Sequence, residues 1–120
     1  MNWKTIRLEL ARTPDFPAGS AGRAYLLRLP LAEDGGVDEA EVRQFPLRAT
    51  ARRFWPNQPD LAGSVIRTPA GWALRWENVA CEPRPLPPCP LSFCEGHSVV
   101  LTEPDGSRLP FRVARVSLLT

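Results

Sequence analysis

Residues 23–31 read RAYLLRLPL, and this stretch decides the fold class because apolar side chains recur at every second position from Tyr25 to Leu31. A period of two places these side chains on one face of a β-strand, whereas the residues between them face the other way. Pro30 falls among the outward residues. Because proline has no N–H to donate, we expect this strand to lie at a sheet edge or to carry a bulge.

The same alternation recurs along the chain and predicts six further strands. They cover residues 6–10, 47–55, 64–67, 72–77, 97–102 and 108–119. Tight turns at Thr68–Gly71 and Pro104–Ser107 join two pairs of these strands as hairpins. In the last strand the phase of the apolar residues changes, which predicts a β-bulge near Ala114 and Arg115.

One segment departs from this rhythm and predicts a short helix over Asp38–Gln44. Asp38 is a favourable N-cap residue, and Glu41 three positions later completes a capping box. Pro46 ends the helix, because the residue before a proline avoids helical dihedral angles. We therefore predict an all-β fold: one domain over residues 1–120, with about seven strands in a compact barrel-like or sandwich arrangement and one short helix.

The charge and composition of the chain exclude several classes of function. The formal net charge of +2 is too small for a surface that is basic throughout, although arginine is abundant and Lys4 is the one lysine. Abundant Arg, Ala, Pro and Gly together are typical of a GC-rich bacterial genome. The first residues carry charges within their apolar stretch, and so form neither a secretion signal nor a membrane span. We expect a cytoplasmic bacterial protein without a membrane partner, whose three cysteines stay reduced.

All three cysteines and the single histidine lie in one stretch, CEPRPLPPCPLSFCEGH. Three thiolates and one imidazole match the closed tetrahedral shell of a structural zinc site. With the spacing C-x7-C-x4-C-x2-H, the residues Cys81, Cys89, Cys94 and His97 resemble the Cys-Cys-Cys-His zinc fingers of the tristetraprolin type, which bind single-stranded RNA. The last gap is shorter than in that family, and five prolines stiffen the loop. A structural zinc-binding protein is therefore the alternative to cysteines that only fill space under a proline loop.

No catalytic constellation emerges from the residues. A Cys94–His97 pair could form a thiolate nucleophile, but no third side chain can be named to orient the imidazole. Phosphate-binding glycine loops, a nucleophile elbow and a telling carboxylate pair are all missing from the sequence. We therefore expect a protein without enzymatic activity and without a cofactor.

The stretch RRFWPN, residues 52–57, is the best candidate for a partner site. Arg52, Arg53, Trp55 and Asn57 could present a basic aromatic surface to a protein or a small-molecule ligand. A barrel that stacks single-stranded nucleic acid on its aromatic side chains, as OB-folds do, is a further alternative. Alternation, however, sends Arg52 and Arg53 to opposite faces of their strand.

These observations predict a small non-enzymatic binding or interaction domain, with no more specific function readable from the residues. Because the basic residues are split between two faces, we expect no specific nucleic-acid binding, and an affinity for single strands no tighter than about 10⁻⁴ M at physiological salt. Trp72 and Trp76 share an apolar face with Leu74, which predicts that both rings lie in the core and are not free to stack on bases.

Overall fold

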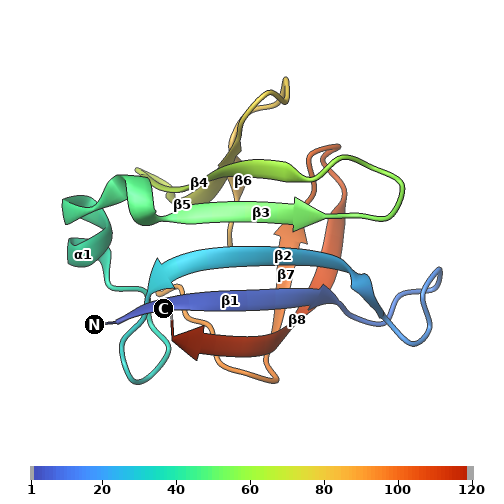
Figure 1. The fold of residues 1–120 in the computed structure, drawn as a ribbon, viewed down its shortest axis with the longest axis horizontal. Coiled ribbons are helices and arrows are strands. Elements are labelled where there is room, and N and C mark those ends of the chain that lie inside the picture. The colour runs from blue at the N-terminus through green and yellow to red at the C-terminus, as the bar shows by residue number, and fades with distance from the viewer. Residues whose placement is uncertain (1, 119–120) are drawn as a thin grey trace.

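The computed structural model describes residues 2–118, which form eight strands, one short helix and a 3-10 turn. The strands are β1 (Trp3–Leu10), β2 (Ser20–Pro30), β3 (Thr50–Phe54), β4 (Leu61–Thr68), β5 (Gly71–Trp76), β6 (Arg84–Pro85), β7 (Ser98–Thr102) and β8 (Arg108–Leu118). The predicted all-β class is confirmed (Figure 1). The strand that alternation did not reveal is β6, because two residues inside a proline run are too few to show a period.

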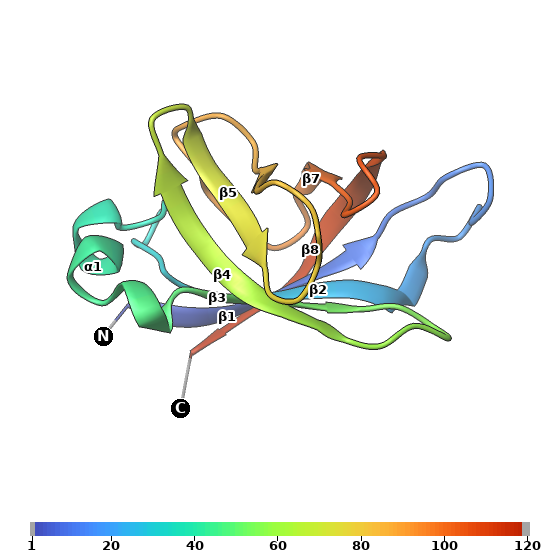
Figure 2. The same ribbon diagram turned by 90° about the horizontal axis from the view of Figure 1, so that it is seen from above.

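All eight strands belong to one antiparallel sheet with the order β6-β5-β4-β3-β2-β1-β8-β7. The sheet curves strongly, so that its two edge strands, β6 and β7, approach each other without pairing (Figure 2). Of the two predicted arrangements, the molecule therefore adopts the barrel-like one, nearly closed. The pairing of β1 with β8, the first and the last strand of the chain, adds the C-terminal hairpin to the sheet and brings β7 toward β6.

The predicted bulge lies in β8, opposite β1. Arg7 is paired with Arg115, whereas the next residue, Leu8, is paired with Val113, so that Ala114 is an additional residue in its strand. An additional residue reverses the inward and outward phase of the strand beyond it. Val116 consequently packs against the same core as Val113, although the two are three positions apart, which in a regular strand would place them on opposite faces.

The predicted helix is confirmed as α1 (Glu39–Gln44), with Asp38 as its N-cap. The Asp38 carboxylate accepts a hydrogen bond of 3.1 Å from the N–H of Glu41, which satisfies one of the free donors of the first turn. A 3-10 turn, η1 (Pro46–Arg48), follows directly. Strand β3 therefore begins at Thr50 and not at residue 47 as the alternation suggested, because Pro46 starts a helical turn instead of a strand.

The core fills the interior of the barrel with the side chains that the alternation assigned to it, including Trp72 and Trp76. Strands β4 and β5 approach each other closely at Gly63. A Cβ atom at this position would lie 2.3 Å from the carbonyl oxygen of Arg75 and 3.0 Å from the Trp76 ring. Glycine is therefore required here by the packing of the indole against the neighbouring strand.

The expectation that Pro30 marks a sheet edge was wrong, and the irregularity that β2 does carry lies at its other end, between Ser20 and Ala24, and not at Pro30. This residue is buried, and β2 lies inside the sheet between β1 and β3. Pro30 is tolerated because it is the last residue of its strand, where its carbonyl leaves the ladder and accepts a hydrogen bond of 2.9 Å from the N–H of Asp38. Proline at this position thus directs the chain out of β2 toward α1.

Candidate functional site

The four residues predicted to bind a partner do not share one surface. Arg52 is exposed on the outer face of β3, whereas Arg53 is buried, as the alternation required. Trp55 is half-buried and packs 6.5 Å from the ring of Phe111, centroid to centroid. Asn57 is exposed in the turn after β3, where its φ of 62° is a conformation that asparagine tolerates. The basic aromatic surface is therefore divided between the outside and the interior.

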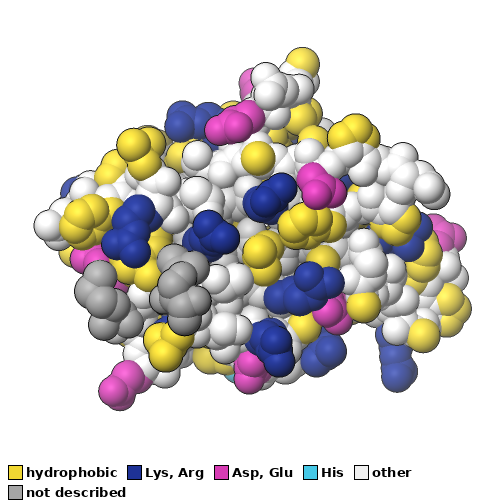
Figure 3. Space-filling model, viewed as in Figure 1, with side chains coloured by type: hydrophobic (Ala, Val, Ile, Leu, Met, Phe, Trp, Pro, Cys, Tyr) yellow, Lys and Arg dark blue, Asp and Glu magenta, His cyan; other side chains and the backbone are white. Residues whose placement is uncertain are grey.

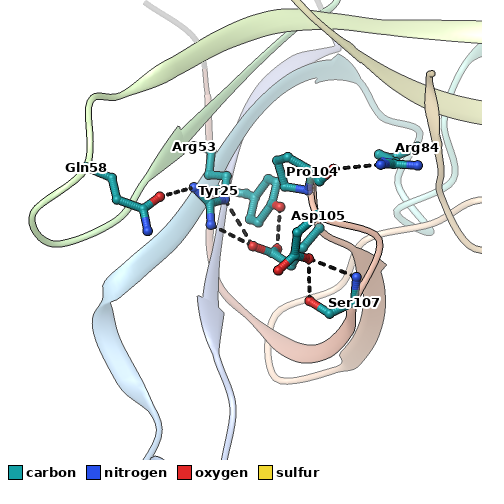
Figure 4. A network of polar contacts seen from close by, with 8 residues as sticks. Tyr25, Arg53, Gln58, Arg84, Pro104, Asp105 and Ser107 are labelled. Atoms are coloured by element: carbon teal, nitrogen blue, oxygen red, sulfur yellow. Dashed lines mark hydrogen bonds and ion pairs between the residues drawn. The ribbon is translucent and has the colours of Figure 1, made fainter. Parts of the chain in front are cut away.

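Arg53 belongs to a buried charge cluster at one end of the barrel (Figure 4). Its Nε and Nη2 atoms donate to one carboxylate oxygen of Glu103, at 3.0 and 2.8 Å, and Nη1 donates to Gln58 at 3.2 Å. The side chains of Arg53 and Glu103 are only 8% and 3% exposed. The ring of Trp55 covers the guanidinium at 4.0 Å, so that the cation faces an aromatic surface on one side and a carboxylate on another.

The second oxygen of Glu103 accepts a hydrogen bond from the hydroxyl of Tyr25 in β2. Burial, followed by the negative charge of Glu103, raises the pKa of Tyr25 far above its ordinary value. The tyrosine therefore remains protonated, and both oxygens of Glu103 are occupied. A carboxylate that is engaged in this way is not free to act as a general base, so the cluster holds β2, β3 and the β7–β8 turn together.

The cluster borders a shallow hollow of about 320 Å³, which Arg53, Gln58 and Asp105 help to line. The hydroxyl and the N–H of Ser107 both donate to the Asp105 carboxylate and lower its pKa. Asp105 is therefore ionised at neutral pH beside the Arg53 cation. Glu103 is paired with Arg53, and Asp105 lies near both Arg53 and Arg84, so two carboxylates balance two guanidinium groups and leave this end of the barrel without a strong preference for an anion.

The cysteines and the histidine are spread along the loop. Cys81 and Cys94 are half-buried, whereas Cys89 and His97 are exposed, and all three thiols are free. The thiol of Cys94 contacts the carbonyl oxygen of Asp34 at 3.3 Å. Within residues 2–118, no three His, Cys, Asp or Glu side chains are placed to hold a metal ion together. The structure thus does not bring the four predicted zinc ligands into one shell, and exposed Cys89 does not fill space in the core.

A groove of about 430 Å³ lies at the other end of the molecule, between the α1–η1 segment and strands β4 and β5. Val42, Val65 and Trp72 form its apolar floor. Leu47 stands at its rim with 93% of its surface exposed, and neighbouring Phe45 is also exposed. The exposed Leu47 thus continues the apolar surface of the floor to the rim of the groove.

Both walls of the groove are anchored. The indole N–H of Trp3 in β1 donates to Glu41 of α1 at 2.9 Å, which holds the helix against the barrel. Arg67 of β4 donates to Glu39 at 3.1 Å and bridges the opposite side. The hydrogen bond from Arg67, with the charge of Arg43, lowers the pKa of Glu39. The groove is therefore preformed, and its acidic residue is ionised and already paired.

Basic side chains outnumber acidic ones around this groove. Arg43, Arg67 and Arg75 contribute three positive charges, and Glu39 contributes one negative charge. Arg43 and Arg67 both pair with Glu39, whereas Arg75 is exposed and pairs with no carboxylate among residues 2–118. An apolar floor with an uncompensated cation at its edge suits a ligand that has an apolar side chain next to a carboxylate.

No protein family, no curated protein and no solved structure matches this chain. Among the residues that the structure describes, no helix has the length and apolar character needed to cross a bilayer. The geometry of the groove and of the charge cluster is thus the basis for any functional conclusion.

Sequence reasoning missed both of these features for identifiable reasons. Leu47 was assigned to the start of a strand, where an exposed leucine attracts no attention, although Pro46 beside it was a signal for a turn. Glu103 lies 50 positions after Arg53, and no local pattern connects them.

Proposed function

We propose that this protein is a non-enzymatic binding domain that holds a short segment of a partner protein in the groove between α1–η1 and β4–β5. The exposed Leu47 beside an apolar floor is the observation that carries the proposal, because an aliphatic side chain in water becomes favourable only when a partner covers it. The three free thiols agree with the reducing environment of the cytoplasm, where we place the protein.

The charges near the groove support binding and not catalysis. Catalytic acids and bases need a free titratable group close to the bound ligand. Glu39 is engaged by two arginines, and the remaining titratable groups that line the groove are arginines, which stay protonated at all physiological pH values. Such groups position a ligand and neutralise its charge, but they do not exchange protons with it.

The aromatic residues favour a protein partner over a single-stranded nucleic acid. Nucleic-acid barrels stack bases on exposed aromatic rings. Here Trp3, Trp72 and Trp76 are buried in the core, and Trp55 is half-buried against Phe111. Phe45 is the one large aromatic side chain that is exposed among residues 2–118, so the surface offers mostly aliphatic and basic side chains instead of a stacking platform.

The test is a selection of peptides from a displayed random library on the wild-type protein, followed by measurement of their affinities by fluorescence anisotropy. We expect the selected peptides to share an aliphatic residue close to Asp or Glu. Leu47→Ser should weaken their binding at least about tenfold, because burial of a leucine side chain contributes about 1.5–3 kcal/mol. The matched control is Leu118→Ser, since Leu118 is also largely exposed but lies at the end of β8.

Two results would overturn the proposal. One is a library that yields no peptide with measurable affinity for the folded protein. The other is a set of peptides that bind wild-type and Leu47→Ser protein equally well, or that lose affinity equally with Leu118→Ser. Thermal unfolding of both variants excludes loss of the fold as the cause, because substitutions at exposed positions usually change stability by less than about 0.5 kcal/mol.

A further inference from the structure

The register of the sheet assembles a row of polar side chains that crosses six strands on the outer face of the barrel. Successive members are cross-strand partners, and such partners project from the same face of a sheet. The row consists of Arg75, Ser64, Thr50, Arg28, Thr5 and Ser117. It therefore contains two arginines, and every other member is a short hydroxyl side chain.

This row connects the groove to a second hollow. Ser64 and Arg75 line the groove, whereas Thr50 and Arg28 line an adjacent hollow of about 270 Å³. The boundary between the two is the cross-strand pair of Thr50 and Ser64, whose side chains are short. The two hollows are thus neighbours along the row, with Arg75 in the groove and Arg28 in the second hollow, and we call them together the trough.

Neither arginine of the trough is neutralised within the molecule. Arg28 and Arg75 are exposed, and no carboxylate among residues 2–118 forms an ion pair with either of them. The same face carries the exposed Arg52, whose nearest acidic oxygen is that of Asp60 at 4.0 Å. Figure 3 shows basic side chains distributed over the face formed by β1, β2 and β3. Glu77 also lines the second hollow, but the two hollows together are lined by five arginines and two glutamates, so the trough carries a net positive charge.

The spacing of the two arginines sets the length of a matching ligand. They are separated by three strand intervals of about 4.8 Å, or about 14 Å between backbones. An extended peptide rises about 3.3 Å per residue, so two carboxylates about four positions apart span this distance. A peptide that runs along the row also passes over the hydroxyls of Ser64 and Thr50, which can donate hydrogen bonds to its backbone and accept them from it.

We propose that the partner segment is an extended acidic peptide that crosses the sheet along this row. Its apolar side chain occupies the groove beside Leu47, one carboxylate pairs with Arg75, and a second carboxylate about four residues further pairs with Arg28. This inference rests on the proposed function, because the anchor in the groove determines where the peptide enters the trough.

An acidic protein segment fits the row better than a nucleic acid does. Bases would need an aromatic surface, and the row has none. The aromatic side chain nearest to it in β3 is Phe54, which is half-buried and has the guanidinium of Arg52 at 5.5 Å from its ring. Carboxylates, in contrast, need only the separated guanidinium groups and the hydroxyls that are present.

The experiment compares fluorescein-labelled synthetic peptides that carry one leucine in a serine-rich background. One peptide has a single glutamate next to the leucine, and the other has a second glutamate about four positions further along, which matches the span of the extended chain. Affinities are measured for wild type, Arg28→Gln, Leu47→Ser and the control Arg112→Gln, by anisotropy at low and at physiological salt. Arg112 is an exposed arginine of β8 that lies outside the row.

We expect the second glutamate to strengthen binding about three- to fivefold at low salt, and less at higher salt. Arg28→Gln should abolish this gain and leave the affinity for the peptide with one glutamate unchanged, whereas Arg112→Gln should change neither. One outcome is that the peptide with one glutamate binds with an affinity that depends on Leu47, whereas the second glutamate and Arg28 have no effect. In that case the proposed role of the trough is refuted and the proposed function stands. If neither peptide binds, the proposed function fails together with the trough.

A parallel titration with a single-stranded oligonucleotide tests the other class of polyanion. If the oligonucleotide binds more tightly than either peptide and Arg28→Gln weakens it, the partner is a nucleic acid and the acidic-peptide proposal is overturned. Thermal unfolding of Arg28→Gln within about 2 °C of wild type shows that the fold is intact, since about 1 kcal/mol shifts the melting temperature of a domain of this size by about 4 °C.

Discussion

Replacement of Glu103 by glutamine tests whether the charge cluster holds this end of the barrel together. Glu103→Gln keeps the shape of the side chain but removes the negative charge that faces Arg53. The guanidinium is 8% exposed and donates two of its hydrogen bonds to one oxygen of this carboxylate. The substitution therefore leaves a buried cation without the carboxylate that pairs with it directly, which is far more costly than the loss of a surface pair.

The expected magnitude follows from this burial. Removal of one partner of a buried ion pair costs about 3–5 kcal/mol. The amide oxygen of glutamine still accepts one hydrogen bond from Arg53, so we expect a value near the lower end, about 3 kcal/mol. For a domain of this size the loss corresponds to a melting temperature about 10 °C lower.

The assay is urea unfolding followed by tryptophan fluorescence, with Glu9→Gln as the matched control. Glu9 pairs with Arg7 at 2.8 Å, the same distance as between Glu103 and Arg53, but the Arg7 side chain is 38% exposed. This control should lose less than about 1 kcal/mol, because solvent screens the pair. If Glu103→Gln loses no more than Glu9→Gln, the Arg53 charge is solvated and the argument from burial is refuted.

Three further predictions concern the tyrosine, a glycine and the thiols. Because burial and the charge of Glu103 raise the pKa of Tyr25 above its ordinary value of 10.0, the folded state retains a proton that the unfolded state loses. The free energy of unfolding should therefore fall above about pH 10, by up to about 1.4 kcal/mol per pH unit from this group. Because Tyr25 is the one tyrosine, tyrosinate absorbance should appear only when the protein unfolds. Tyrosinate absorbance in folded protein near pH 10 would contradict this prediction. Gly63→Ala should cost about 1–3 kcal/mol in chemical unfolding because the added Cβ overlaps the β5 backbone, whereas Gly22→Ala, where a Cβ meets nothing closer than 3.8 Å, should be nearly neutral. Exposed Cys89 should react with a thiol reagent before Cys81 and Cys94, and elemental analysis should find less than one zinc per chain. Equal reaction rates of the three thiols, or one zinc bound per chain, would show that the loop differs from this structure.

The strands and the helix could be predicted because their causes are local. The period of two in residues 23–31, the phase change near Ala114 and the cap at Asp38 each depend on residues that are neighbours along the chain. The opposite orientations of Arg52 and Arg53 followed from the same local rule, and the structure confirms them. Pro30 was misplaced because its strand lies inside the sheet, which is a property of strand order and not of local sequence.

The candidate site could not be predicted in the same way, because the contacts that form it join distant parts of the chain. Arg53 is buried beside Glu103 only because closure of the barrel brings the β7–β8 turn next to β3. The groove exists only because α1 and η1 fold back against β4 and β5.

By itself, the sequence determined which segments are strands, except for β6 and the start of β3, which of their faces are buried and where the helix begins. Only the tertiary structure decided which strands are neighbours and in what register, and a shift of one residue in register would move every side chain of a strand to the other face. The row from Arg75 to Arg28 therefore exists by virtue of three strand pairings. Alternation constrains each strand separately, whereas pairing is selected by the packing of the whole core, which no local pattern contains.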